Sequence, residues 1–479
     1  MKYENSVVLL APYCGEREYE LCDQNLGLLY LSSVLTKSTP SFPNKIIDTR
    51  ANKMNSEQAT GAILSINPGI LGISCTTNQF STGVEIARRI KLSRPETVIV
   101  FGGAHVSALP KESIMLPCMD YVVQGEGEWA LHNIVNHVVN KTPLKVPGIY
   151  YKDIEGQNIS YKESPSDATS GGTRGLLDEL PFPDFDKIEI KKYFHRQKRF
   201  AHTKNTPYLC IISSRGCPGQ CVFCAHAVFG QRIRARSPEN IVNEIEYNIS
   251  KYNIREIRIM DDCFNFNKAR VIEFCKLVIE HNLKVSFALP NGVRADRLDE
   301  EMLCWMKKAG FYMIFLGIES ADQEVLNTIK KGYDLKKIEK VIKLCKKIGF
   351  YTGLFLVVGL PGSSNYSEYK TLRFVKKANP DFIGVAMCTP YPGSELYNSV
   401  NPVNNWDFYK HDFTKKGSIP LYIPARRNKE ELLYWHRKML FSFYLRFTYI
   451  FSRIKHISWI SKRLFFFLNA AYRRFIKHF

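Results

Sequence analysis

Short hydrophobic runs alternate with amphipathic stretches over residues 1–145. Five short apolar runs predict strands, at Val7–Ala11, Lys45–Asp48, Ile70–Ser74, Val98–Phe101 and Tyr121–Val123. Between them, apolar residues recur at helical spacing and predict helices at Leu26–Leu35, Glu57–Ile66, Gln79–Leu92 and Ala130–Val139. Regular alternation of this kind predicts an α/β domain built on a doubly wound, Rossmann-like parallel sheet.

The predicted carboxyl ends of three of these strands are rich in small and polar residues. They read SCTTN (74–78), GGAH (102–105) and QGEGE (124–128). Ligands of doubly wound sheets bind beyond these ends, and glycine lets a ligand approach the backbone closely. Taken singly, each stretch is better explained by ordinary turn chemistry, so a ligand site here needs further support.

A second alternating block runs from Leu209 to Cys388. Its six predicted strands are Leu209–Ser213, Glu256–Met260, Lys284–Leu289, Met313–Ile318, Thr352–Val358 and Asp381–Ala386, with helices between them. Six βα units predict a partial or complete parallel barrel, in which the chemistry gathers at the carboxyl ends of the strands. Polar or glycine-rich motifs follow all six strands: a cysteine loop, DDCF, NGVR, ES, GLPG and TPYPG. Their convergence on one end is stronger evidence for a site than any single motif.

The segment between the two blocks predicts a linker over residues 146–200. SPSDATSGGTRG (164–175) is small and polar, as in loops, and ELPFPDFD (179–186) is proline-bound and extended. The predicted organisation is therefore a first domain over 1–145, this linker, a barrel over 201–400 and a helical, basic region over 401–479.

Three cysteines lie within eight residues directly after the first strand of the second block, in RGCPGQCVFCAH (215–226). Disulfides are not expected, because the chain has 13 cysteines, an odd number, and its start lacks a secretory signal, which predicts a cytoplasmic protein with reduced thiols. Pro218 and Gly219 argue against a helix that would align the thiols. Two metal sites stay open. Zinc would recruit Cys210 or His226; a four-iron cluster would leave one iron free of protein ligands.

Composition adds one strong asymmetry. The hydrophobic fraction of 45% and the charged fraction of 23% are typical of a globular protein, and no apolar run is long enough for a transmembrane helix. The formal net charge is +20, yet the residues after Glu431 contain ten Lys or Arg and no acidic residue. That tail carries half of the net charge, so charge alone gives weak support for nucleic-acid binding by the rest.

The same tail, residues 432–479, also contains 15 aromatic residues. Three interpretations stay open. It could form a helical domain that covers the substrate, a basic amphipathic surface that contacts an anionic membrane, or an RNA-binding region of basic and aromatic residues. A membrane surface would suit a lipid-like substrate.

CPGQCVFC matches the CxxxCxxC signature of the radical S-adenosylmethionine (SAM) superfamily, and its place after the first strand of a (βα)6 block agrees with that family. The chain thus resembles radical SAM enzymes. The resemblance implies that Cys217, Cys221 and Cys224 ligate a [4Fe–4S] cluster and that SAM binds the remaining iron. It further implies SAM contacts for Phe223, Glu319, Gly359, Gly362 and Arg294.

For several of these residues the sequence also supports another explanation. Core packing explains Phe223 as well as a contact with adenine does. The family often continues GLPG as GLPGET, whereas this chain reads GLPGSS (359–364), which puts the role of that glutamate in doubt. Asp261, Asp262 and Arg294 resemble polar positions at the barrel mouth, and ordinary surface loops would explain them too.

The first block resembles the cobalamin-binding domain that precedes the barrel in one large subclass of the superfamily. The similarity spans roughly residues 5 to 400 and implies cobalamin contacts at Ser74, Thr76, Gly102, Gly103, His105, Gly125 and Glu126. The DxHxxG motif that supplies a lower histidine ligand to cobalt elsewhere is missing, as is usual in this subclass. His105 is therefore expected to be a turn histidine or a cobalamin contact rather than a cobalt ligand.

The expected function is that of a radical SAM enzyme with a [4Fe–4S] cluster and cobalamin that methylates an unactivated carbon, or phosphorus, of a small or lipid-like molecule. Expected partners are that substrate, a flavodoxin- or ferredoxin-type reductant and, through the C-terminal region, a membrane surface; nucleic acid is not expected. The alternatives are a cobalamin-dependent cyclase or ring-rearranging enzyme without methyl transfer, such as the magnesium-protoporphyrin cyclase subclass, and a non-catalytic cobalamin or iron–sulfur sensor.

Overall fold

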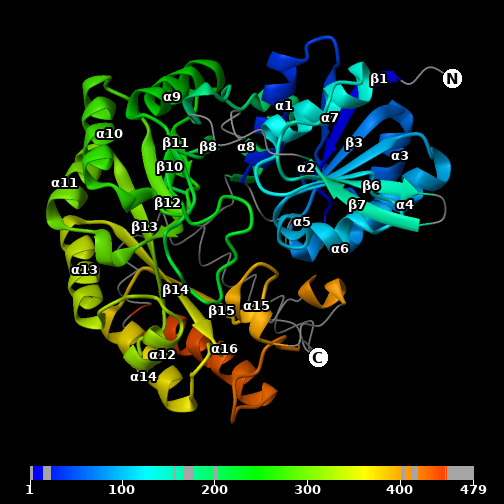
Figure 1. Cartoon of the computed structure of the whole chain (residues 1–479). Coiled ribbons are helices and arrows are strands. Elements are labelled where there is room, and N and C mark those ends of the chain that lie inside the picture. Colours follow the sequence, from blue (N-terminus) through cyan, green and yellow to red (C-terminus); the bar gives the residue numbers. More distant parts are fainter. Residues whose placement is uncertain are drawn as a thin grey trace.

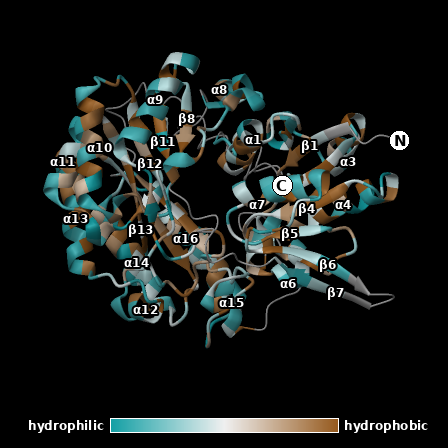
Figure 2. Ribbon diagram, turned by 45° about the horizontal axis from the view of Figure 1, so that its top comes forward, coloured by the Kyte–Doolittle hydropathy of each residue, from teal (hydrophilic) through white to brown (hydrophobic). Residues whose placement is uncertain are grey.

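The chain folds into two lobes, each built around a parallel sheet (Figure 1). The computed structural model describes residues 4–13, 23–155, 158–164, 177–197, 203–400, 405–410, 419–447 and 449. The blue-to-cyan lobe holds the N-terminal sheet, and the green-to-orange lobe holds the second sheet and the last described helix. Hydrophobic residues line the strands and the inner faces of the helices, while the outer faces are largely hydrophilic (Figure 2).

The first sheet has the strand order β2-β1-β3-β4-β5-β6-β7. Its parallel strands are β1 (Glu4–Leu10), β2 (Asn44–Ile47), β3 (Pro68–Ser74), β4 (Val98–Gly102) and β5 (Tyr121–Val123). One face is covered by α1 (Leu26–Ser38) and α7 (Glu128–Asn140), and the other by α3 (Ser56–Ile66) and α4 (Phe80–Ser93). All five predicted strands and all four predicted helices of this lobe are present, in a doubly wound arrangement.

The sheet continues beyond the predicted boundary at residue 145. Strands β6 (Ile149–Glu155) and β7 (Asn158–Glu163) pair antiparallel with β5 and with each other, inside the segment predicted to be a linker. Antiparallel edge strands can leave one face in solvent, so they lack the continuous apolar run that marks the buried strands. The rest of that segment holds the helix α8 (Ile190–Gln197), which packs on the short helix α2 (Thr49–Asn52): Lys192 Nζ donates to Asn52 Oδ1 at 2.6 Å.

The second sheet has six parallel strands in the order β15-β14-β13-β12-β11-β8. They are β8 (Tyr208–Ile211), β11 (Glu256–Ile259), β12 (Ser286–Val293), β13 (Phe311–Glu319), β14 (Tyr351–Val358) and β15 (Phe382–Met387). The helices α9 (Pro238–Tyr252), α10 (Lys268–Glu280), α11 (Glu300–Lys308), α13 (Leu335–Ile348) and α14 (Asn365–Ala378) line its outer side (Figure 1). Each predicted strand of this block is present, so the motifs that follow them share one edge of the sheet.

Stacked aromatic rings fill the inner side of this sheet. The rings of Phe315 and Phe355 stack at 4.9 Å between centroids, and Phe382 stacks on Phe315 at 6.1 Å. Glycine is required opposite them, because a Cβ on Gly353 would lie 2.2 Å from the ring of Phe315. Phe315 lies four residues before Glu319 on β13, so this apolar floor lies beneath the carboxyl ends of the strands.

The helix α16 (Lys429–Tyr444) covers the edge strand β15. The Tyr444 hydroxyl accepts from the Ile383 amide at 3.0 Å and donates to its carbonyl at 2.9 Å, and His436 Nε2 lies 3.1 Å from the Val385 carbonyl. An uncovered edge strand presents unpaired backbone groups to solvent and to other chains. Residues 450–479, most of the basic aromatic tail, lie outside the described residues. Within the described part of the chain, no helix combines the length and hydrophobicity needed to span a bilayer.

Candidate functional site

The three clustered cysteines lie in a loop closed at its base by a short two-stranded stem. Strand β9 (Ser214–Arg215) pairs antiparallel with β10 (Arg234–Ala235), so residues 216–233 form the loop. Gly216 has φ +89°, and a Cβ there would lie 2.5 Å from the Arg232 carbonyl oxygen. Only glycine permits this close approach, which makes the stem narrow and fixes where the loop begins.

Two of the thiols face one stretch of backbone. A Cβ built on Gly219 would lie 3.4 Å from Cys217 Sγ and 3.8 Å from Cys221 Sγ, while Cys224 is exposed. Among the described residues, no three His, Cys, Asp or Glu side chains meet closely enough to hold a single metal ion. A cubane cluster takes each thiolate on a different iron, so its ligands do not need to meet at one point, and this loop suits such a cluster.

The Cys263 thiol, in the DDCF motif after β11, supports this loop. It donates a hydrogen bond to the sulfur of Cys217, which lowers the pKa of the Cys217 thiol. Because metals bind the thiolate form, the bond favours the ligating state. Cys210 faces the first lobe instead, with its sulfur 3.6 Å from Asp23 Oδ1. The zinc alternative thus loses Cys210 as a ligand, while His226 Nε2 stays buried without a hydrogen-bond partner among the described atoms.

Charged residues from two further strand ends and from the loop after a short helix surround the thiols. Arg294 lies beside Gly219, bonds Asp296 at 3.0 and 3.1 Å and lies over the Tyr333 ring. Glu319, at the end of β13, has φ +66° and forms a largely buried ion pair with Lys331 at 2.8 Å. Burial raises the pKa of the Cys221 thiol, and the positive charges of Lys331 and Arg294 oppose that rise.

A protein site with a cation next to an anion suits the amino-acid end of a ligand. The cation binds the carboxylate of the ligand, and the anion binds its ammonium. Arg294 and Lys331 fit the carboxylate of the methionyl part of SAM, and Glu319 fits an ammonium or a hydroxyl. Lys331 was missed from the sequence because it follows no strand motif. The position of Lys331 in the sequence could have indicated it, because Lys331 lies in the loop after α12 (Gln323–Thr328), and this loop returns toward the Glu319 turn.

The GLPG turn after β14 obtains a carboxylate from elsewhere in the chain. Gly359 and Gly362 both have positive φ, at +78° and +76°, and the Gly359 amide donates to Glu368 Oε1 at 3.0 Å. Glu368 is buried in α14 and forms an ion pair with Arg427 at 3.0 Å. This turn is therefore anchored although GLPGSS lacks the glutamate of the family motif. Glu368 accepts the hydrogen bond from the turn, and Arg427, just before α16, neutralises the buried charge of Glu368.

The predicted cobalamin contacts gather at the carboxyl edge of the first sheet. A Cβ on Gly103 would lie 2.6 Å from the Cys75 carbonyl oxygen and 3.0 Å from Ser74 Oγ, whereas one on Gly102 would meet no atom within 4 Å. Gly102 thus leaves open space for a ligand. The Thr76 side chain bonds Gln79 Oε1 at 2.9 Å, and the Gly125 amide donates to Ser107 Oγ at 2.9 Å.

His105 is enclosed by aromatic rings. Its ring lies 3.8 Å from the Phe80 ring between centroids, tilted by 31°, and Trp406, from the short 3-10 turn Trp406–Lys410, meets it edge-on at 4.5 Å. Burial lowers the pKa of His105 to about 3, so the ring is neutral near neutral pH. This environment agrees with a buried turn histidine rather than a metal ligand.

Glu126 lies at the boundary between the lobes. Its carboxylate bonds Arg215 at 2.5 Å and also Arg234, the two residues that face each other in the β9–β10 stem. It was predicted as a cobalamin contact, but its described partners belong to the stem of the cysteine loop. Glu128, two residues later, bonds the other amino group of Arg215 at 2.6 Å.

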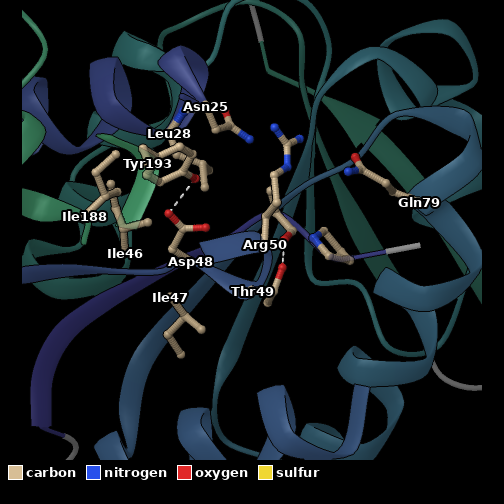
Figure 3. A pocket seen from close by; sticks show the side chains of 12 residues that line it. Asn25, Leu28, Ile46, Ile47, Asp48, Thr49, Arg50, Gln79, Ile188 and Tyr193 are labelled. Carbon is tan, nitrogen blue, oxygen red and sulfur yellow. Dashed lines mark hydrogen bonds between the residues drawn. The ribbon is translucent and has the colours of Figure 1, made fainter. Parts of the chain in front are cut away.

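A small cavity opens at the carboxyl ends of β1 and β2 (Figure 3). Asn25 and Arg50 point toward one another across it, and the Tyr193 hydroxyl of α8 bonds Asp48 at 2.6 Å at its side. It lies on the edge where ligands of doubly wound sheets bind. Its lining could not be read from the sequence, because α8 is far along the chain from β2.

Two family models match this chain. The model of the radical SAM superfamily matches residues 211–375, and the model of the B12 binding domain matches residues 17–135. This chain belongs to the cobalamin-dependent radical SAM enzymes. The two matched regions are the two lobes, and the cysteine loop and the Gly102–Gly103 edge fall inside them.

Individual relatives agree with this membership. The enzyme is 29% identical over 450 residues to an uncharacterized methyltransferase of Pyrococcus horikoshii, covering 91% of this chain and 92% of the relative. It is 27% identical over 395 residues to an anaerobic magnesium-protoporphyrin IX monomethyl ester cyclase of Rubrivivax gelatinosus, covering 81% and 68%. The structure of the radical SAM methyltransferase TsrM from Kitasatospora setae, with cobalamin and a [4Fe–4S] cluster bound, superposes with a TM-score of 0.67 at 16% identity, over 90% and 81%. That likeness shows a shared fold.

The predicted class of enzyme and its cofactors are thereby confirmed. This cobalamin-dependent radical SAM enzyme uses a [4Fe–4S] cluster, SAM and cobalamin. That Cys217, Cys221 and Cys224 hold this cluster stays a prediction from the motif and from the shape of the loop.

Proposed function

We propose that this radical SAM enzyme transfers a methyl group to an unactivated carbon, or to phosphorus, of a small or lipid-like molecule. The observation that carries the proposal is the direct contact between the two cofactor-binding regions, in which Glu126 beside Gly125 bonds Arg215 beside Cys217. When bound, the cluster with SAM supplies radical chemistry, and cobalamin supplies the methyl group. The chain orients these groups and keeps water away.

The proposed site residues follow the geometry. Cys217, Cys221 and Cys224 would hold the cluster; Phe223, Arg294, Glu319, Gly359 and Gly362 would contact SAM, with Lys331 added. Ser74, Thr76, Gly102, Gly103 and Gly125 would line the cobalamin edge, with His105 buried beneath it. Phe223 is half-buried against the main core, so its contact with adenine rests on the motif. We also propose that the six-stranded sheet is the (βα)6 partial barrel of the superfamily.

Within this arrangement the chain's own residues have three tasks. Arg294 and Lys331 bind a carboxylate, which fixes one end of SAM relative to the thiols. The stacked rings of Phe315, Phe355 and Phe382 close the inner side of the sheet to water. Neutral His105 adds no charge beneath the cobalamin edge.

Anaerobic product analysis tests the proposal. The reconstituted enzyme would be given SAM with a deuterated methyl group, a strong reductant and extracts of candidate metabolites. We expect 5′-deoxyadenosine together with a product heavier by one labelled methyl group. Formation of 5′-deoxyadenosine with no labelled product in any extract would contradict methyl transfer, and no 5′-deoxyadenosine at all would support a sensor.

A second candidate is a cyclase or ring-rearranging enzyme that does not methylate. The similarity to the Rubrivivax gelatinosus cyclase over 81% of this chain favours it. The same assay separates the two, because a cyclase product carries no label from SAM.

For partners, we propose a flavodoxin- or ferredoxin-type reductant and contact with an anionic membrane through the C-terminal region. The outer face of α16 supports the membrane contact, since Tyr434 and Phe441 on this helix and Leu445 directly after it are 54%, 49% and 67% exposed, and the basic tail follows them in the sequence. Exposed apolar side chains beside cations are typical of interfacial helices.

A further inference from the structure

The cysteine loop is tied to the first lobe by buried ion pairs. The Arg215 side chain, 3% exposed, places Nη1 2.5 Å from Glu126 Oε2 and Nη2 2.6 Å from Glu128 Oε1. Arg234, opposite Arg215 in the stem, also bonds Glu126. Two arginines of the second lobe thus meet two glutamates of the first.

The guanidinium of Arg215 is held on its faces as well as at its edge. The Tyr30 ring from α1 lies 5.3 Å from its central carbon, and the Phe229 ring from the cysteine loop lies 5.2 Å from it. A planar guanidinium can bond two carboxylates and lie against aromatic rings at once, whereas a lysine ammonium is a point charge without a fixed plane. The environment therefore specifies both the position and the orientation of Arg215.

These contacts connect the two cofactor regions with no element between them. Arg215 precedes Cys217 by two residues, and Glu126 directly follows Gly125 at the end of β5. A Cβ on Gly125 would lie 3.6 Å from the Val228 carbonyl oxygen, so the loop backbone also touches this edge. A shift of the ion pairs would change the distance between the cluster ligands and the cobalamin edge directly.

We propose that Arg215 is a positioning residue that sets the separation and orientation of the cluster and cobalamin. The proposal rests on the proposed function, in that both cofactors act on one substrate between the lobes. Reactions between bound groups lose rate steeply when one group is displaced by about 1 Å. Buried ion pairs are poor stabilisers, and their best-attested use is to select one arrangement; a pair across the lobe boundary selects their relative placement.

The test compares Arg215→Lys and Glu126→Gln with the matched control Arg236→Lys. Arg236 forms an equally buried pair with Glu244, but both residues lie in the second lobe. Each protein is loaded with its cluster and with cobalamin in the cob(II)alamin form. The measurement is the microwave power that half-saturates the cob(II)alamin signal, with the cluster oxidised and then reduced, because a paramagnetic cluster speeds this relaxation only at short distance.

We expect the reduced cluster to raise the half-saturation power in the wild type and in Arg236→Lys. In Arg215→Lys and Glu126→Gln this rise should fall by at least twofold, with iron content unchanged. Glu126→Gln leaves the cysteine loop intact, so it decides the matter if Arg215→Lys loses iron. An unchanged rise in Glu126→Gln would overturn the proposal.

A second measurement needs no cofactor. In the apo-protein, amide hydrogen exchange over 124–129 should be at least tenfold faster in Arg215→Lys and Glu126→Gln than in the wild type and Arg236→Lys. If the wild type fails to bind cobalamin, the proposed function fails while exchange still tests the tie between the lobes. Equal exchange in all four proteins would show that these ion pairs do not hold the lobes and would overturn the proposal.

Discussion

At the scale of single residues, Cys263 is a thiol that supports a cluster ligand. Its hydrogen bond to Cys217 favours the thiolate, and hydrogen bonds to cluster sulfurs tune the reduction potential. We predict that Cys263→Ala keeps about four irons per chain, as a cubane requires, and shifts the reduction potential of the cluster to more negative values. Iron analysis and redox titration check this prediction, and loss of iron from Cys263→Ala would make Cys263 a ligand instead.

The three proposed ligands give a second prediction. Replacing Cys217, Cys221 and Cys224 by Ala should remove the cluster and all SAM cleavage, which iron analysis checks.

The burial of His105 leads to a prediction about how the stability of the protein depends on pH. Its pKa of about 3 in the folded protein lies below the usual value of 6.5, because burial disfavours the charged ring. Between these two values the unfolded chain binds more protons, so stability falls as pH falls through this window. At pH 5 the loss relative to pH 7 is roughly 2 kcal/mol from this residue. His105→Phe keeps a ring against Phe80 and Trp406 and should lose less melting temperature between pH 7 and pH 5; an equal loss in both proteins would contradict the assignment.

The same residue bears on cobalt. A buried, neutral His105 between two rings is not positioned as a ligand, so the electron paramagnetic resonance spectrum of bound cob(II)alamin should show no splitting from a histidine nitrogen. A splitting that disappears in His105→Phe would identify this residue as a cobalt ligand.

At the scale of elements, α16 completes the second sheet through side chains rather than through another strand. Tyr444→Phe would leave the Ile383 amide and carbonyl without their partner, at about 1–3 kcal/mol for buried groups. Amide exchange in β15 should report this as easier local opening. Tyr434→Phe is the control, because that hydroxyl lies on the exposed face of the same helix and accepts a hydrogen bond from Lys438 at 2.7 Å. Equal protection of β15 in both variants would show that α16 does not seal this edge.

The elements also show which parts of the structure the pattern of apolar and polar residues predicts. Buried parallel strands are continuous apolar runs, so all eleven predicted strands are present in the structure. Strands β6 and β7 were missed because apolar and polar residues alternate only weakly along this antiparallel pair at the sheet edge. The cysteines and the Glu319 turn follow strand ends and could be found by position. Lys331, Glu368 and the Arg215 pairs could not, because each joins residues whose proximity only the folded chain creates.

At the scale of the whole molecule, the first part of the C-terminal region belongs to the core of the second lobe. Leu432, Trp435 and Phe443 are buried against the second lobe, so a chain cut after Glu431 would lose part of its core. A cut after Tyr449 preserves α16 and removes seven Lys or Arg. Each cation near an anionic surface contributes about 1 kcal/mol, so we predict that the full chain co-sediments with anionic liposomes at low salt. The chain ending at Tyr449 should bind at least tenfold more weakly, and salt should weaken binding of the full chain.

The full chain and the chain ending at Tyr449 should have the same melting temperature and the same rate of SAM cleavage. This comparison is the control for folding. If the full chain ignores anionic liposomes at low ionic strength, the membrane contact is wrong. The interpretation that the tail covers the substrate would then predict that the shorter chain cleaves SAM but forms no product.

The covering of β15 by α16 has a consequence for how this protein is made. The edge strand ends at Met387, and the helix that seals it ends at Tyr444, 57 residues later. At about 5–20 residues per second of synthesis, the strand emerges from the ribosome roughly 3–11 s before its cover does. During that interval the nascent sheet exposes an open edge, the kind of surface on which neighbouring chains pair and aggregate. Slow codons between these two positions should therefore lower the soluble yield more than the same codons placed after Tyr444.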